Sequence, residues 1–191
     1  MSTLIIVLRV VSLAAFAAPM LLSNRARHGE PAVRVQQRFI DRAPLAANLA
    51  AFGLFFPSLL IFPRSSEGPM ALPLALSGCM LALTGAILVL RSRAELGSAW
   101  SLLPRADRDA GLVTTGPYRL VRHPIYLGLT VLAAGNALCF GSGLSFLLVL
   151  SGIVPTFAWR ARVEELQLSR RFGERFAVYR QQTKMIIPHL L

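Results

Sequence analysis

The sequence predicts an all-α integral membrane protein with about five transmembrane helices, and three observations lead to this class. Hydrophobic residues make up 54% of the 191 residues and charged residues only 15%, and the mean hydropathy is +0.57. A soluble domain of this length would need more polar surface. Four long apolar regions stand out, at 2–22, 45–62, 70–90 and 125–159. Finally, the basic residues gather between and after these regions, so the whole chain 1–191 is expected to form a single membrane domain.

The lengths of the apolar regions give the number of spans. The first and third contain about 21 residues each, enough to cross a hydrocarbon core about 30 Å thick. The fourth contains Gly141-Ser142-Gly143, a turn signal that divides it into a helical hairpin of two spans of about 16 residues. Ala15-Phe16-Ala17 resembles a signal-peptide cleavage site, but no positive side chain precedes Leu4 and Arg9 interrupts the apolar run. A first transmembrane span is therefore favoured over a cleaved signal.

The distribution of charge predicts the orientation in the membrane. Eighteen of the twenty Lys and Arg residues lie in 23–44, 91–124 and 160–191, which fall on one side of the membrane if all five spans cross. The positive-inside rule makes that side cytoplasmic, with the N-terminus outward and the active site facing the cytoplasm. The formal net charge of +11 is thus a topology signal, with contact to anionic headgroups as a second use, and no nucleic-acid partner is expected.

Residues beyond the hairpin are expected to form a cytoplasmic amphipathic tail. A helix over 156–171 leaves the membrane, Gly173 caps its C-terminus, and a second short helix follows over 174–183. This tail packs as an end piece or closes over the site as a lid. The two cysteines lie inside apolar spans and the three histidines are scattered, so no metal site is expected.

The segment from Gly116 to Gly128 is the candidate ligand site. It places two prolines, two tyrosines, two arginines and a histidine beside a hydrophobic run. Gly116 opens a turn that lets the backbone approach a ligand, and Pro124 fits the first position of the next helix. The start of that helix can bind a carboxylate or phosphate. Each residue alone also fits a simple interfacial anchor, but their density favours a ligand site.

Arg160, Glu164 and Glu165 form a second cluster. Arg160 and Glu164 are four residues apart and therefore share a helix face. An exposed intrahelical pair of this kind contributes only about 0.3–0.5 kcal/mol. Adjacent carboxylates at a membrane boundary are otherwise unfavourable, and a bound cation or sugar hydroxyls would give them a purpose.

Taken together, these residues resemble the isoprenylcysteine carboxyl methyltransferase family, and more distantly the phosphatidylethanolamine N-methyltransferases. The resemblance covers about residues 90–190, and it is carried by Leu96-Gly97 with Trp100, Gly111-Leu112-Val113, Gly116-Pro117-Tyr118, Arg122-His123-Pro124-Ile125-Tyr126-Leu127-Gly128, Arg160, Glu164-Glu165, Leu168, Phe172-Gly173, Tyr179 and Pro188.

The resemblance implies that the cofactor is S-adenosylmethionine and that a methyl group passes to a lipid-embedded acceptor. It makes 1–90 a transmembrane scaffold and 91–191 the cofactor-binding and catalytic half. Arg160 would hold the acceptor, most simply the C-terminal carboxylate of an isoprenylcysteine or an analogous lipophilic molecule. The bilayer itself is a partner, and no obligate protein partner is inferred. The cofactor-binding residues carried over from the family are Leu112, Val113, Tyr118, His123, Pro124, Ile125, Tyr126 and Glu164. The chain departs from the family at Leu103, where a cofactor-contacting glutamine is replaced, and at Ala110-Gly111.

Other functions fit parts of the same pattern. A phospholipid N-methyltransferase performs the same transfer to an amine, for which His123 or Glu165 would take the proton. An NADPH-dependent sterol or enone reductase shares an Arg-His-Pro-x-Tyr element, although the chain is short for that class and offers no clear site for the extra phosphate. A membrane scaffold without activity would bind neither ligand. A carboxylate acceptor needs no base, because it is already ionised at neutral pH.

Overall fold

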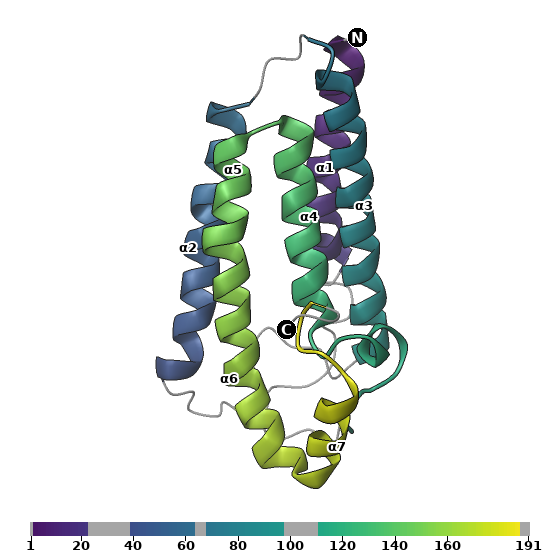
Figure 1. Cartoon of the computed structure of the whole chain (residues 1–191), viewed down its shortest axis with the longest axis vertical. Coiled ribbons are helices and arrows are strands. Elements are labelled where there is room, and N and C mark those ends of the chain that lie inside the picture. The colour runs from purple at the N-terminus through teal and green to yellow at the C-terminus, as the bar shows by residue number, and fades with distance from the viewer. Residues whose placement is uncertain (1, 23–38, 64–67, 98–110, 188–191) are drawn as a thin grey trace.

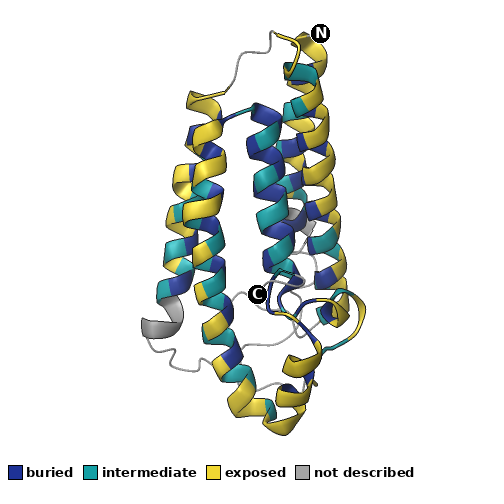
Figure 2. Ribbon diagram, in the orientation of Figure 1, coloured by how far each residue is buried: buried dark blue, intermediate teal, exposed yellow. Residues whose placement is uncertain are grey.

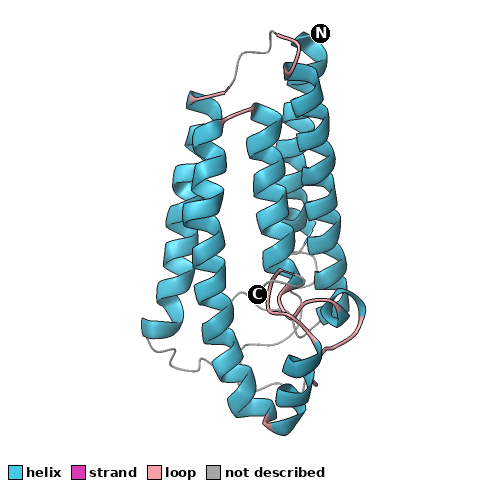
Figure 3. Cartoon of the chain, in the orientation of Figure 1, coloured by secondary structure: helices cyan, strands magenta, loops and turns pink. Residues whose placement is uncertain are grey.

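The computed structural model describes residues 2–22, 39–63, 68–97 and 111–187, and within these ranges the regular structure is helical (Figure 3). One isolated parallel bridge joins Val121 to Lys184. The helices, in chain order, are α1 Ser2–Leu22, α2 Phe39–Ile61, α3 Ala71–Leu96, the 3₁₀ helix η3 Gly116–Arg119, α4 Pro124–Phe140, α5 Gly143–Leu148, the π-helical turn η4 Val149–Ile153, α6 Val154–Phe172 and α7 Glu174–Gln182. The helices α1, α2, α3 and α4 and the continuous run α5–η4–α6 lie side by side as an up-and-down bundle, with α7 folded back beneath it (Figure 1).

Four helices are long and apolar enough to cross a membrane, and α4 is a shorter apolar helix of 17 residues. The predicted turn at 141–143 is present: Gly141 has φ +65° and ends α4 in the left-handed conformation. The second arm of the hairpin is not short, however. α5, η4 and α6 together form a continuous apolar-to-charged helix over Gly143–Phe172, 30 residues long. At about 1.5 Å per residue its last turns extend well beyond a 30 Å core.

The boundaries differ from the expected spans wherever charged residues continue a helix. α2 begins at Phe39 rather than near 45, and α3 continues to Leu96 rather than ending near 90. Gly97, at φ +50°, lies immediately after α3. Arginine is a good helix former, so Arg91 and Arg93 prolong α3 beyond the apolar run. The tail matches its prediction, with α6 ending before Gly173, also at positive φ, and α7 following at once.

α4 is the central helix, and its closest neighbour is α3. Figure 2 shows α4 almost entirely in the colours of buried and half-buried residues. A Cβ added at Gly78 of α3 would lie 2.2 Å from the Cys139 backbone nitrogen, and one at Gly135 of α4 would lie 2.4 Å from the Ala82 nitrogen. Gly85 and Gly128 meet in the same way one heptad further along. These small residues allow the two backbones to pack directly against each other, as in other membrane helix pairs.

The faces that point away from the bundle are apolar over the long helices. Exposed side chains of this kind include Val7 and Val10 on α1, Leu54 and Leu60 on α2 and Met80 and Ile87 on α3. Such surface suits lipid and would be unfavourable in water. With the apolar lengths of the helices, it identifies an integral membrane protein.

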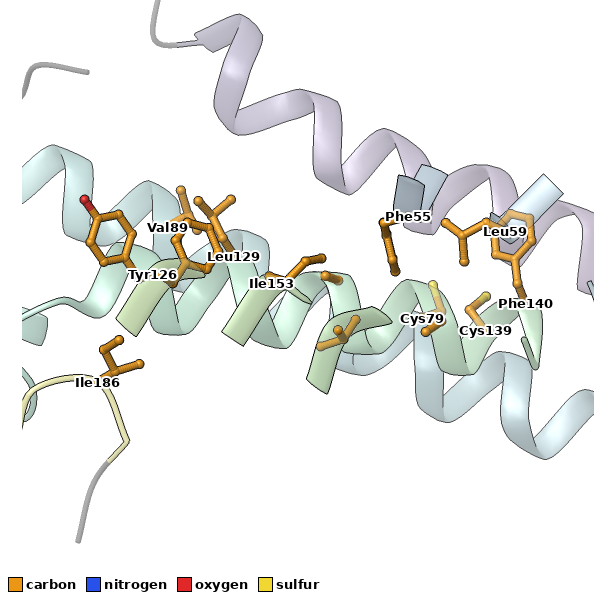
Figure 4. Packing of buried hydrophobic residues seen from close by; sticks show 14 of the residues in the cluster. Phe55, Leu59, Cys79, Val89, Tyr126, Leu129, Cys139, Phe140, Ile153 and Ile186 are labelled. Atoms are coloured by element: carbon orange, nitrogen blue, oxygen red, sulfur yellow. The ribbon is translucent and has the colours of Figure 1, made fainter. Parts of the chain in front are cut away.

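The buried core extends along the whole bundle (Figure 4). Tyr126 and Ile186 lie at the end where α7 folds back, whereas Phe140, Cys139 and Leu59 lie at the opposite end. The described parts of the three basic segments lie toward the α7 end of the bundle: the start of α2, the last turns of α3, the segment before α4, the second half of α6 and α7 (Figure 1). The core and the basic end meet at Tyr126.

Candidate active site at the basic end of the bundle

The segment before α4 folds as a compact turn that delivers His123 to the bundle. Gly116 has φ +57° and lies against α3, where an added Cβ would be 2.8 Å from a carboxylate oxygen of Glu95. The Thr115 hydroxyl donates to that same carboxylate. Pro117 lies in the first turn of η3, and Pro124 is the first residue of α4. Proline at these positions fixes the backbone without losing a helical hydrogen bond.

Three rings stack in sequence from the start of α4 to α6. The His123 and Tyr126 rings are nearly parallel, with centroids 5.4 Å apart and an interplanar angle of 6°. On its other side Tyr126 stacks on Phe157 of α6, at 4.9 Å and 14°. His123 is 7% exposed and Tyr126 is 9% exposed. The stack joins α4 to α6 at the level where the core ends.

Glu164 lies at the polar edge of this stack. Its Oε1 atom accepts hydrogen bonds from the Tyr126 hydroxyl and, at 3.2 Å, from the Nε of Arg160. Its Oε2 atom lies 3.6 Å from His123 Nδ1. The Arg160 guanidinium also lies over the Tyr126 ring, 5.6 Å from its centroid. Arg160 and Glu164 therefore form the predicted i,i+4 pair, and Tyr126 brings it against α4.

Glu165 holds a second, more deeply buried ion pair. Arg122 Nε lies 2.7 Å from Glu165 Oε1, and the two side chains are 8% and 10% exposed. His123 Nε2 lies 3.5 Å from the same oxygen. Arg180 approaches the other oxygen at 3.9 Å from an exposed position. Each of the adjacent carboxylates thus has its own arginine, which offsets the repulsion between the two glutamates.

The segment after α7 completes the site by pairing with the segment before α4. The backbone N–H groups of Arg122 and His123 donate to the carbonyl oxygens of Lys184 and Met185, at 2.8 and 2.9 Å. The Arg122 guanidinium donates to the Thr183 carbonyl. These bonds satisfy backbone groups that the turn leaves open. They also fix the position of His123 from the side opposite Tyr126.

Tyr179 provides a second link between α7 and the turn. Its hydroxyl donates to the Tyr118 carbonyl at 2.7 Å. Burial raises the pKa of Tyr179 to about 12, against the opposing charge of Arg122. Burial also raises the pKa of Tyr118, and the neighbouring acidic groups of Tyr179, Glu164 and Glu95 raise it further. Both phenols therefore remain protonated donors at neutral pH.

A surface pocket of about 240 Å³ lies beside Tyr179. It is lined by Leu112, Thr114, Arg175, Val178, Tyr179 and Gln182. Its wall combines apolar side chains with an arginine, an amide and two hydroxyls, which are groups suited to a small polar ligand.

The structure brings some of the predicted site residues into direct contact and places others nearby. His123, Tyr126, Arg160 and Glu164 form one cluster, and Pro124 is buried beside them. Ile125 packs against the core. Leu112 lines the pocket and Val113 follows it, half-buried, while Tyr118 is linked to the pocket through Tyr179. Trp100, Leu103, Ala110 and Pro188 lie outside the described residues.

The contacts made by Arg122, Tyr179 and Thr183 were not predicted from the sequence, and Glu165 was expected either to bind a cation or sugar together with Glu164 or to act as a base. The partners of Arg122 are 43 and 61 positions away along the chain. No local pattern indicates such contacts. The signal that the sequence did offer is the position of Arg122 and Glu165 next to predicted membrane spans, because a charged side chain that is buried there requires a partner.

Comparison with known proteins indicates the family and the fold of this chain. The sequence model of the phospholipid methyltransferase family matches residues 74–175. A protein-S-isoprenylcysteine O-methyltransferase of Schizosaccharomyces pombe is 34% identical over 103 residues, which cover 52% of this chain and 44% of the relative. The cobalt-zinc-cadmium resistance protein CzcN of Cupriavidus metallidurans is 28% identical over 165 residues, covering 82% of this chain and 69% of that protein.

A solved structure has the same fold. The eukaryotic intramembrane Ras methyltransferase, isoprenylcysteine carboxyl methyltransferase, superposes with a TM-score of 0.59 at 24% identity over 76% of this chain and 52% of that one. The chain spans about half the length of this protein and of the Schizosaccharomyces pombe relative. At this level of identity the likeness shows that the helical bundle has the fold of that intramembrane protein. Because the matched segment covers more than half of the sequence, the chain belongs to the phospholipid methyltransferase family.

Proposed function

We propose that this protein transfers a methyl group from S-adenosylmethionine to the carboxylate of a lipid-embedded acceptor, most simply an isoprenylcysteine. The observation that carries the proposal is the Glu164 carboxylate held against the stacked Tyr126 ring by the Tyr126 hydroxyl and Arg160. Three similar proteins of fungi and plants carry the name protein-S-isoprenylcysteine O-methyltransferase. That name supports the same acceptor class for this chain.

The residues present fit this cofactor. A sulfonium is a cation, which a carboxylate attracts. Glu164 offers that carboxylate next to the Tyr126 hydroxyl, whereas the two faces of the Tyr126 ring are covered by His123 and Phe157. Leu112 and Tyr179 line a pocket next to Tyr118 that would take the polar remainder of the molecule. His123 and Pro124 would shape the backbone between these two parts, with Val113 and Ile125 as flanking apolar contacts.

The cofactor supplies an electrophilic methyl: the acceptor oxygen forms a bond to it while the carbon–sulfur bond breaks, and sulfur keeps the electron pair. The anionic oxygen and the cationic sulfonium become a neutral ester and a neutral thioether, so no proton has to be removed. The chain therefore needs to supply orientation and exclusion of water rather than a strong base. Arg160 would orient the acceptor carboxylate through its planar set of donors.

The location of the site fits the two routes that such a reaction requires. Residues 91–191 provide the cofactor contacts, and 1–90 provide most of the lipid-facing helices. The basic end of the bundle would face the cytoplasm under the positive-inside rule, where the soluble cofactor is available. The acceptor's apolar chain would reach Arg160 from the bilayer.

A phospholipid N-methyltransferase is the second candidate, because the matching family model carries that description. An amine acceptor must lose a proton, and His123 lies between Glu164 and Glu165 where it could receive one. Product analysis after incubation with labelled methyl donor separates an ester from an N-methyl lipid. The ester is stable to acid but is cleaved by mild base, whereas an N-methyl group is stable to both.

The cofactor class can be tested before any acceptor is known. Purified protein in detergent is heated with S-adenosylhomocysteine or with NADPH, and the melting temperature is measured. We expect S-adenosylhomocysteine to raise the melting temperature and NADPH to leave it unchanged, because a ligand that binds only the folded state stabilises that state. A rise with NADPH alone would assign the site to a reductase, and no rise with either would contradict an enzymatic site.

A further inference from the structure

Asn48 is a buried polar residue in the part of the chain expected to be a scaffold. It lies on α2, within a predicted membrane span, and is 4% exposed. Its Nδ2 atom donates to the Thr156 hydroxyl of α6 at 2.6 Å. Its Oδ1 atom is buried, and none of the described residues donates a hydrogen bond to it. The Asn48 Nδ2 group therefore joins α2 to α6, whereas the Oδ1 atom makes no hydrogen bond to the described part of the chain.

The position of Asn48 relates it directly to the proposed acceptor site. Thr156, its partner, is one helical turn before Arg160 on α6, a distance of about 6 Å along the axis. Phe52, one turn after Asn48 on α2, packs edge-on against Phe157 at 6.0 Å. Phe157 in turn stacks on Tyr126. Asn48 is thus connected to the ring stack in two ways, through Thr156, the residue before Phe157, and through Phe52.

A buried acceptor without a donor is costly in a membrane. Leaving such a group unpaired costs about 1–3 kcal/mol, and water is scarce at this depth. An apolar residue at position 48 would remove this cost. A donor on a bound molecule gives the unpaired oxygen a role.

We propose that Asn48 Oδ1 accepts a hydrogen bond from an N–H group of the methyl acceptor, so that the site selects acceptors with an amide next to the carboxylate. The inference rests on the proposed function, since it assumes that Arg160 holds the carboxylate. In an N-acylated cysteine the amide nitrogen and the carboxylate share one carbon atom. An acceptor held through its carboxylate by Arg160 would therefore carry its N–H group close to that carboxylate, and Thr156, the partner of Asn48, is one helical turn from Arg160.

Two small acceptors that differ in this one group test the proposal. N-acetyl-S-farnesylcysteine carries the amide, and S-farnesylthiopropionate has the same tail and carboxylate but no N–H. Methyl transfer to each is measured with labelled methyl donor in proteoliposomes, for the natural protein and for Asn48→Leu. The ratio of kcat/KM between the two acceptors is the readout, because it does not depend on how much of a variant is folded.

We expect the natural protein to prefer the amide-bearing acceptor by about ten-fold, the effect of one hydrogen bond in a dry site. Asn48→Leu should abolish this preference by losing activity on the amide-bearing acceptor, and Asn48→Asp, which keeps acceptor oxygens, should retain part of it. Asn136→Leu is the matched control. Asn136 is fully buried, but its Oδ1 accepts from Ser12 and its Nδ2 donates to the Leu132 carbonyl. This control should keep the preference.

Each other outcome overturns the inference in a recognisable way. If the natural protein methylates both acceptors equally, or if Asn48→Leu keeps the preference, Asn48 only joins α2 to α6 and the proposed function stands. If the natural protein methylates neither acceptor but still binds S-adenosylhomocysteine, the carboxylate acceptor is wrong and this inference fails with it. Asn48→Leu with a lower melting temperature and an unchanged ratio also assigns a purely structural role.

Discussion

Arg122 and Glu165 form a 2.7 Å ion pair in which both side chains are about nine-tenths buried. The pair connects the segment before α4 to the outer part of α6, and the Arg122 guanidinium continues to the Thr183 carbonyl after α7. Three regions that are far apart in the sequence therefore meet at one guanidinium. The geometry of His123, the next residue, depends on this contact.

Loss of this pair should destabilise the protein strongly. Arg122→Met leaves the Glu165 charge buried without its arginine, and breaking a buried pair in this way costs about 3–5 kcal/mol. We expect a large fall in melting temperature in detergent. Arg180→Ala is the control, because Arg180 is 3.9 Å from the same carboxylate but its side chain is 66% exposed. Its effect should be small, and an equal effect of the two variants would contradict the importance of burial.

The two members of the Arg160–Glu164 pair should affect different steps. Glu164→Gln removes the negative charge next to the proposed sulfonium, so affinity for S-adenosylmethionine should fall by ten-fold or more, measured by calorimetry in detergent. Arg160→Ala should lower turnover more than cofactor affinity, because Arg160 is proposed to hold the acceptor. Full cofactor binding by Glu164→Gln and by Tyr126→Ala would remove both residues from the site. Equal losses of turnover and affinity in Arg160→Ala would contradict the division of roles.

The contact between α3 and α4 should tolerate no side chain at Gly78. Gly78→Ala places a methyl group 2.2 Å from the Cys139 nitrogen, and the clash is with backbone, which cannot rotate away. We expect poor expression and loss of the folded form on size-exclusion chromatography. Gly53→Ala in α2 is the matched control, because nothing lies within 4 Å of its added methyl. Alanine is the better helix former, so this variant should be as stable as the natural protein or slightly more stable. Normal folding of Gly78→Ala would mean that α3 and α4 are further apart.

Tyr179 should make stability depend on pH in the alkaline range. Its pKa is raised from about 10 in the unfolded chain to about 12 in the fold. The unfolded state therefore loses its proton first, and the contribution of Tyr179 is complete below pH 10 and lost as the pH rises toward 12. Tyr179→Phe removes the hydrogen bond to the Tyr118 carbonyl. We expect the free energy of unfolding at neutral pH to fall by about 1 kcal/mol, and the melting temperature to fall with it.

Melting curves from pH 8 to 11.5 check this expectation. The difference between the natural protein and Tyr179→Phe should narrow as the pH rises past 10. If the difference in melting temperature stays constant over the whole pH range, the pKa of Tyr179 is not raised by burial in the folded protein.

The sequence predicted those features that depend on local chemistry. Gly141 and Gly173 mark real helix ends because both positions require positive φ, and the i,i+4 spacing of Arg160 and Glu164 placed them on one face. The end of α3 was missed because hydropathy falls at Arg91 whereas helix propensity does not. The Arg122–Glu165 pair and the pairing of 121–123 with 184–185 were not predictable, because they join residues more than forty positions apart. Long-range contacts of this kind follow from packing and leave no periodic signal.

The parallel pairing of residues 121–123 with 184–185 also determines when the site can form during biosynthesis. All five long helices leave the ribosome before Thr183 and Met185, so the bundle can insert into the bilayer while the Arg122 guanidinium and the His123 backbone still lack these partners. The nascent chain at that stage has its long helices but not the contacts that hold Arg122 and His123 in place. Completion of the candidate site is therefore expected to be a late event in biosynthesis, which depends on the last few residues of the chain to be made.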